Sequence, residues 1–202
     1  MPSPNAYDFY TQAIAAYVPA DPPVDAILDS KKIPEAQWKT VYPTAKKEAW
    51  LRQNGKTLDL LREGFQYSSR VPPARDEAAV AERFPVYSKF REMARLLTIE
   101  SHARSERGNW SGASDSALDT LRLGHDLAHG GTLIDYLVGA ASNSFAYREF
   151  WEIMPHLNAI ESKAAARRLE SILQSRASYA EVMREEKHFG QTSLLEQMRS
   201  SE

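Results

Sequence analysis

The sequence predicts an all-α protein, an antiparallel stack or bundle of helices joined by an N-terminal helical segment. Apolar residues recur at spacings of three and four over long stretches, which is the period of a helix with one buried face. No stretch shows the sustained alternation of apolar and polar residues that predicts a strand. The 202 residues fit a single domain with its own core. We expect residues 1–74 to form N-terminal helices with proline-rich crossings and residues 75–202 to form the regular stack.

The N-terminal segment is predicted to be helical but interrupted. Asn5 can cap a first helix, whose tyrosines share one face. Five prolines between Pro19 and Pro43 exclude a long helix there. Gly55 weakens the next helical stretch and marks a place where it can break. The expected elements are a helix over residues 5–18, an irregular crossing over 19–43 with at most one short turn at 24–28, a helix over 44–65 and a loop over 68–77.

The second part of the chain has the pattern of regular helices joined by short turns. Gly108 can end one helix in the left-handed conformation, and Asn109 can cap the next. Thr132 can cap the helix that follows "HGG", and Pro155 stops that helix. The expected helices cover residues 85–107, 110–129, 133–154, 158–174 and 177–199. In the first of them, the residues expected to face inward are Phe90, Met93, Ala94, Leu97 and Ala103.

Composition argues against several classes of protein. A net charge of −2 leaves no basic excess to neutralise phosphates, so a nucleic-acid partner is not expected. The longest uncharged apolar-leaning run, "YLVGAASNSFAY", is much shorter than the roughly 20 residues of a membrane-spanning helix, so no membrane insertion is expected. Because cysteine is absent, there is no disulfide framework and no thiolate nucleophile or metal ligand.

Both ends of the chain suggest a piece trimmed from a longer protein. A short lead containing proline and serine passes directly into a helical pattern, and the last residues stop close to an apolar helix face. If the part removed is an N-terminal anchor or signal, the protein lies outside the cytoplasm. The sequence carries no other indication of a compartment.

The stretch "GNWSGASDSAL" predicts a tight turn between two antiparallel helices. Glycine makes the reversal, the tryptophan ring wedges between the helices, and alanine lets the axes approach. In this pattern residues 97–123 resemble a tetratricopeptide repeat hairpin. The residues that match its signature are Gly108, Asn109, Trp110, Ala113 and Ala117. No second copy appears at the repeat period of about 34 residues, and any helical hairpin with a good turn has the same features.

Residues 44–198 also resemble a group of bacterial all-helical proteins to which no activity is assigned. The shared features are a "GNW" turn, the runs "DTLRLG" and "GGTLIDYLVGAA", and a late helix similar to "REEKHFG". The resemblance implies an all-helical fold and implies no activity.

The stretch "LGHDLAHGG" contains residue types that bind metal ions. It resembles the core of the HD-domain phosphohydrolases, in which a His-Asp pair ends a helix. The resemblance implies that His125 and Asp126 are metal ligands, that His129 contacts a second metal or a phosphate, and that a metal-bound water attacks phosphorus. That family also has an earlier histidine and a later aspartate. The candidates here are His102 and Asp135.

The same residues suit purely structural roles. Histidines in the last turn of a helix interact favourably with the negative end of its dipole, and the glycines end the helix. Glu185-x-x-His188 has the spacing used in di-iron bundles, but it occurs once and suits a solvated face. Aromatic residues near the N-terminus either line a groove or, as we favour, fasten the irregular segment to the helical body. They are Tyr7, Tyr10, Tyr17, Trp38, Tyr42 and Trp50.

Three functions remain open. The leading one is a non-catalytic helical scaffold that binds a protein or peptide and needs no cofactor, because no complete catalytic constellation can be assembled. The alternative is a metal-dependent phosphohydrolase that uses His125, Asp126 and His129. The third is a structural ectodomain of a membrane-anchored protein. A scaffold predicts a groove with polar and aromatic walls, whereas the enzyme predicts His102 or another ligand within a few ångströms of His125.

Overall fold

A computed structural model describes residues 1–20, 43–74 and 76–200. Over these residues the chain is helical and has no strand, which confirms the predicted all-α class. The elements are α1 (Ala6–Ala16), α4 (Thr44–Gln53), α5 (Gly55–Gly64), α6 (Glu77–Ala81), α7 (Phe84–Glu106), α8 (Trp110–Asp126), α9 (Leu133–Ile153), the single turn η1 (Met154–His156), α10 (Ala159–Gln174) and α11 (Tyr179–Ser200). The turn expected at 24–28, Trp38 and Tyr42 lie outside the described ranges.

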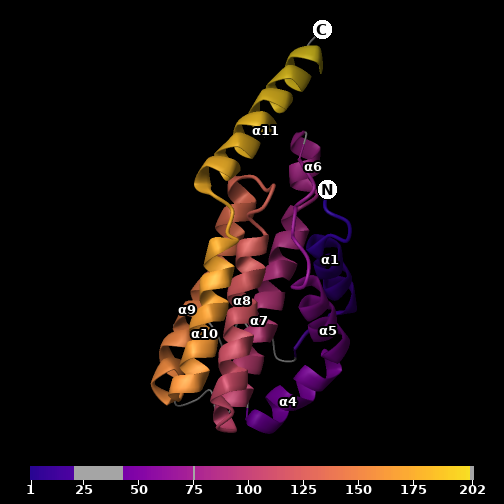
Figure 1. Cartoon of the computed structure of the whole chain (residues 1–202). Helices are drawn as coiled ribbons and strands as arrows, with labels where there is room; N and C mark the ends of the chain where they lie inside the picture. The colour runs from indigo at the N-terminus through magenta and orange to yellow at the C-terminus, as the bar shows by residue number, and fades with distance from the viewer. Residues whose placement is uncertain (21–42, 75, 201–202) are drawn as a thin grey trace.

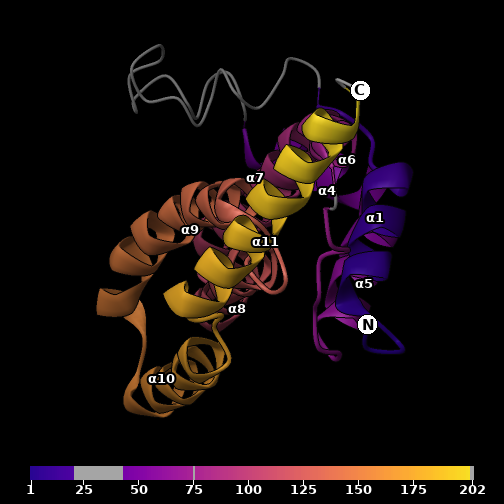
Figure 2. The same ribbon diagram turned by 90° about the horizontal axis from the view of Figure 1, so that it is seen from above.

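The long hairpin of α7 and α8 forms the centre of the molecule (Figure 1). α9 packs along both of these helices, and α10 packs against α8. Seen from above, α1 and α5 lie on one side of the central hairpin and α9 and α10 on the other (Figure 2). None of the helices within the described ranges combines the length and apolarity that crossing a bilayer requires.

The inward face of α7 is the one that the sequence predicts. The five residues expected to point inward are all buried, and most of them belong to the main core cluster with Tyr10 of α1 and Leu61 of α5. Burying large apolar side chains contributes about 1.5–3 kcal/mol each, so this cluster supplies much of the stability of the N-terminal half. The N-terminal helices are therefore part of the same folded body as the central hairpin.

The described N-terminal aromatic residues fasten α1 to the body, which is the role that the sequence favours. The rings of Tyr10 and Phe65 lie 5.7 Å apart, and those of Tyr17 and Trp50 lie 6.2 Å apart, between centroids. Trp50 Nε1 donates a hydrogen bond to the Val18 carbonyl at 2.8 Å. These rings are packed against other elements, so they do not form an open groove.

The turn between α7 and α8 has the predicted local structure. Gly108 has a φ of +73°, where a side chain would be strained. Asn109 caps α8 by accepting a hydrogen bond from the Gly112 amide at 3.0 Å. Ala113 is fully buried. The Trp110 ring differs from the expectation: it stacks on His156 of η1, with 3.9 Å between ring centroids, and packs beside Ile153 of α9 instead of wedging between α7 and α8. The hairpin is thus present, while its kinship with tetratricopeptide repeats stays a prediction.

Three boundaries differ from the expected ones. The stretch expected over 44–65 breaks at Asn54, next to the glycine that weakens it, because the Asn54 side chain bonds to the Val18 backbone. α8 ends at Asp126, so His129 lies in the turn after the helix. A short helix, α6, forms at the end of the expected 68–77 loop and beyond it, where Asp76 caps it through the Ala79 amide.

Candidate binding groove

Asp126 is buried at the end of α8 and is fully engaged in a hydrogen-bond network. Its carboxylate accepts from the Tyr10 hydroxyl at 2.5 Å and from Arg122 Nε at 2.8 and 2.9 Å. Arg122 also donates to the Tyr67 carbonyl at 3.2 Å. Burial raises the pKa of Asp126, although the charge of Arg122 acts in the opposite direction. The network connects α1 with α8 and leaves the carboxylate oxygens occupied.

The two histidines of the motif have different surroundings. His125 is half-buried in the last turn of α8, and its Nε2 is buried without a hydrogen-bond partner among the described residues. Burial lowers the pKa of His125, and the charges of Arg176, His129 and Arg122 lower it further. The imidazole is therefore neutral near pH 7. His129 Nδ1 lies 3.8 Å from Glu181 Oε1 on α11.

The residues of the motif do not fit a metal ion. The described part of the chain contains no group of three or more His, Asp or Glu side chains placed to hold one. His102 does not lie near His125: it contacts Glu149 Oε1 at 3.0 Å, near the start of α8. The neighbouring Ser101 hydroxyl donates a hydrogen bond to the Ala113 carbonyl, which places this part of α7 beside the start of α8. His125 lies twelve residues further along α8, or about 18 Å of helix. The phosphohydrolase arrangement is not assembled.

An open groove runs between α9 and α10, and its floor is α8. It contains two cavities that share Tyr147 in their walls. One end is apolar and has a cavity of about 230 Å³. The other end, beside His125, is more polar and has a cavity of about 530 Å³. We call this feature the α9–α10 groove. Figure 2 shows α9 and α10 on the same side of the central hairpin.

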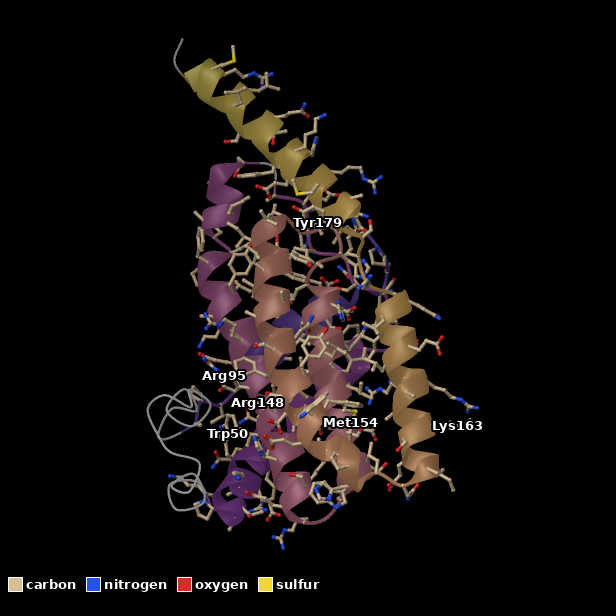
Figure 3. The ribbon with its side chains drawn as sticks, turned by 90° about the vertical axis from the view of Figure 1, so that its left-hand side faces the viewer. Trp50, Arg95, Arg148, Met154, Lys163 and Tyr179 are labelled. Carbon is tan, nitrogen blue, oxygen red and sulfur yellow. The ribbon has the colours of Figure 1, made fainter. Side chains whose placement is uncertain are left out.

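The apolar end of the groove has an apolar floor and an exposed aromatic rim. Leu118 and Leu121 of α8 form the floor, and both are buried. On the rim, Trp151 of α9 is 75% exposed and Met154 is 42% exposed. Figure 3 shows Met154 on the side of α9 that faces α10. The lining of this end is almost wholly apolar, so it favours apolar side chains of a bound molecule.

The polar end of the groove has a cationic and aromatic wall. Tyr136 and Tyr179 meet edge to face with 6.3 Å between ring centroids, and Arg176 lies in the link from α10 to α11. None of the described lining residues is acidic. Arg176 makes no ion pair with any described residue. A polar or acidic group of a bound molecule would find complementary charge here.

Ion pairs hold α10 at the edge of the groove. Arg168 of α10 reaches α8, where it pairs with the buried carboxylate of Asp119 and, at 3.0 Å, with Asp115. On the far side Asp119 also accepts from Arg62 of α5 at 3.3 Å. Burial raises the pKa of Asp119, against the opposing effect of Arg168. Apolar contacts add to these pairs, because Ala165 and Ile172 of α10 pack with Leu118 and Leu121 of α8, so α10 covers part of the apolar floor.

The sequence does not reveal the residues of the apolar end. Apolar residues occur on every side of α9, so its pattern does not show which face is buried. The packing of α10 on α8 is what identifies the groove-lining residues of this end, such as Trp151, Met154 and Tyr147. The sequence does single out His125, although for metal chemistry, and that residue lines the polar end.

Comparisons with protein-family models, with curated proteins and with solved structures found no match to this chain.

Proposed function

We propose that this protein is a non-catalytic helical scaffold that binds another protein by taking up one of its helices in the α9–α10 groove. The observation that carries the proposal is the exposed side chain of Trp151 beside an apolar floor. Large apolar side chains that gather on a surface, with polar residues around them, commonly mark sites of interaction. Tryptophan is also among the residues that contribute most to binding at protein interfaces.

The apolar end of the groove suits the side chains of a helix better than a small molecule. Its cavity, about 230 Å³, is smaller than the roughly 300–1,000 Å³ typical of ligand pockets, whereas the polar end, about 530 Å³, lies within that range. The apolar end has room for a few side chains of a partner. An amphipathic helix presents such side chains at spacings of three, four and seven residues, and it carries its own backbone hydrogen bonds. The occupant is thus a helix with one apolar face.

Polarity along the groove favours one orientation of that helix. Its apolar anchors would lie between Leu118 and Trp151, and a polar or acidic end would lie near Arg176. Both ends of the groove are built on α8 and α9, which are buried against the rest of the body, so the site is formed before a partner arrives. A preformed site loses less conformational entropy on binding.

The test is a selection of peptides on the purified protein. Helical peptides with randomised surface positions are selected, and their affinities are measured by fluorescence polarisation. Selected peptides should carry two or three apolar residues on one face and should compete for a single site. The variant Trp151→Glu should weaken their binding about tenfold or more, since it places a charge on the rim. The matched control is Ile160→Glu, because Ile160 is 82% exposed on α10 and does not line the groove.

Two results would overturn the proposal. One is that selection yields no peptide that competes for a common site. The other is that selected peptides bind Trp151→Glu and the wild-type protein equally well. Far-ultraviolet circular dichroism confirms in each case that the variant keeps its helical content.

A further inference from the structure

α11 differs from the other long helices because it leaves the body. It has 22 residues, or about 33 Å of helix, and it rises beyond the ends of α8 and α10 (Figure 1). Its first turns are attached to the body. Val182 is buried with Ala128 and Ala177, and Glu186 accepts a hydrogen bond from the Leu133 amide at 2.9 Å. The second half projects.

The projecting half of α11 carries an exposed apolar cluster. Leu194 is 59% exposed, Leu195 is 55% exposed and Met198 is 61% exposed. Residues three and four apart lie on one side of a helix, so Met198 is a neighbour of both leucines. Three large apolar side chains at the free end of a helix are costly to leave in water. We call these residues the α11 cluster.

The same chain therefore has an apolar helix end without a cover and an apolar groove without an occupant. The α11 cluster spans four residue steps, or about 6 Å of helix. The rim of the groove from Tyr147 to Met154 spans seven steps, or about 10 Å. The cluster fits within that length, and it presents the spacing of three and four that the groove suits.

We infer that the α11 cluster docks in the α9–α10 groove of a second copy of this chain. This inference rests on the proposed function, since it names the helix that the groove takes. Two copies can each donate α11 and each receive it, which fills both grooves in a symmetric dimer. Within one chain the attachments of Val182 and Glu186 hold the cluster beyond the end of its own groove. Docking between copies needs none of these contacts to break.

The first part of the test measures association by sedimentation velocity over a range of concentrations. The wild-type chain should form a dimer that dissociates on dilution. Leu195→Glu and Trp151→Glu should each weaken dimerisation about tenfold or more, because each places a charge in the apolar contact. Ile160→Glu, outside the groove, should leave it unchanged.

Mixing the two damaged variants separates docking between copies from a general loss of stability in either variant. A dimer of Leu195→Glu alone, or of Trp151→Glu alone, has no intact contact. A mixed dimer has one, because the intact α11 of Trp151→Glu meets the intact groove of Leu195→Glu. The mixture should therefore associate more strongly than either variant alone.

Disulfide trapping supplies a direct readout, since the chain has no cysteine of its own. Leu194→Cys mixed with Trp151→Cys should form a crosslinked heterodimer under mild oxidation. Leu194→Cys mixed with Ile160→Cys should not. If the double variant Leu194→Cys/Trp151→Cys instead crosslinks within a monomer, α11 closes on its own groove and the inference is wrong.

The remaining outcomes are also decisive. A chain that stays monomeric at every concentration, while selected peptides still bind its groove, overturns the inference and leaves the proposed function standing. A dimer that both glutamate variants leave intact also overturns it, because association then uses another surface. If neither peptides nor a second copy engage the groove, both proposals fail.

Discussion

Gly124 of α8 and Gly139 of α9 bring the backbones of their two helices into direct contact. A Cβ atom on Gly139 would lie 2.2 Å from the Gly124 carbonyl oxygen, and one on Gly124 would lie 2.6 Å from the Gly139 oxygen. Neither position has room for a side chain. Because this contact sets how closely α9 approaches α8, it also sets where the α9 wall of the groove stands.

The variant Gly139→Ala should destabilise the protein. The added methyl group would overlap backbone atoms of α8, which cannot move away as a flexible side chain can. Overpacking of this kind costs about 1–3 kcal/mol. The free energy of unfolding is measured by urea denaturation. The control is Gly190→Ala on α11, where nothing lies within 4 Å of the added Cβ. That variant should be stabilising by about 0.5–1 kcal/mol, as expected for glycine within a helix. Equal effects of the two changes would contradict the close helix contact.

Asp126 should behave as a structural residue. Asp126→Ala would leave the Arg122 guanidinium and the Tyr10 hydroxyl without their buried acceptor, at a cost of about 3–5 kcal/mol. Tyr10→Phe, which removes one donor, should cost about 1–3 kcal/mol. Asp115→Ala is the control, because its pair with Arg168 lies at the surface and such pairs contribute about 0–1 kcal/mol. If Asp126→Ala left stability unchanged and removed a bound metal, the structural role would be wrong.

The buried imidazole of His125 should make stability depend on pH. Burial lowers its pKa in the folded state below the unfolded value of about 6.5, so the folded protein binds this proton less readily. The contribution of His125 is therefore fully present above pH ~6.5 and is lost as pH falls through the folded pKa. Urea denaturation at a series of pH values measures the effect.

A difference between variants isolates that contribution. The stability of His125→Asn should fall less steeply on acidification than that of the wild type. The buried carboxyls of Asp119 and Asp126, whose pKa values are raised by burial, are common to both proteins and cancel in the comparison. Parallel slopes for the variant and the wild type would show that His125 is not desolvated.

The sequence predicts the helices well where local signals are strong. The glycine at 108 and the cap at 109 define the α7–α8 hairpin, and a capping box at Thr132 starts α9. The five inward residues predicted for α7 are buried, but Leu96 and Ile99 are buried as well, because this central helix is packed on several sides. The break at Asn54 is predicted only as a weak point in the helix. The Asn54 side chain bonds to the backbone of Val18, 36 positions away, and local sequence does not reveal such a distant contact.

The candidate site could not be predicted, for a physical reason. The groove depends on where α9 and α10 each pack against α8, and contacts between residues far apart in the sequence, such as the pair of Arg168 with Asp119, set this position for α10. The sequence does not single out Trp151, and only packing shows that it is 75% exposed. The "GHDLAHGG" motif allows a metal site or a structural helix end, and only the structure shows that the Asp126 carboxylate accepts hydrogen bonds from Arg122 and Tyr10.

The most direct test of the groove is fluorine NMR of the protein labelled with fluorotryptophan. The Trp151 signal is assigned with Trp151→Phe, and a peptide selected on the protein is then titrated. We predict that the Trp151 signal shifts as the peptide saturates, because its exposed ring becomes covered. The signals of Trp50, which is buried, and of Trp110, which stacks on His156, should stay in place. A saturable shift at Trp110 or Trp50 with none at Trp151 would contradict the assignment of the α9–α10 groove as the binding site.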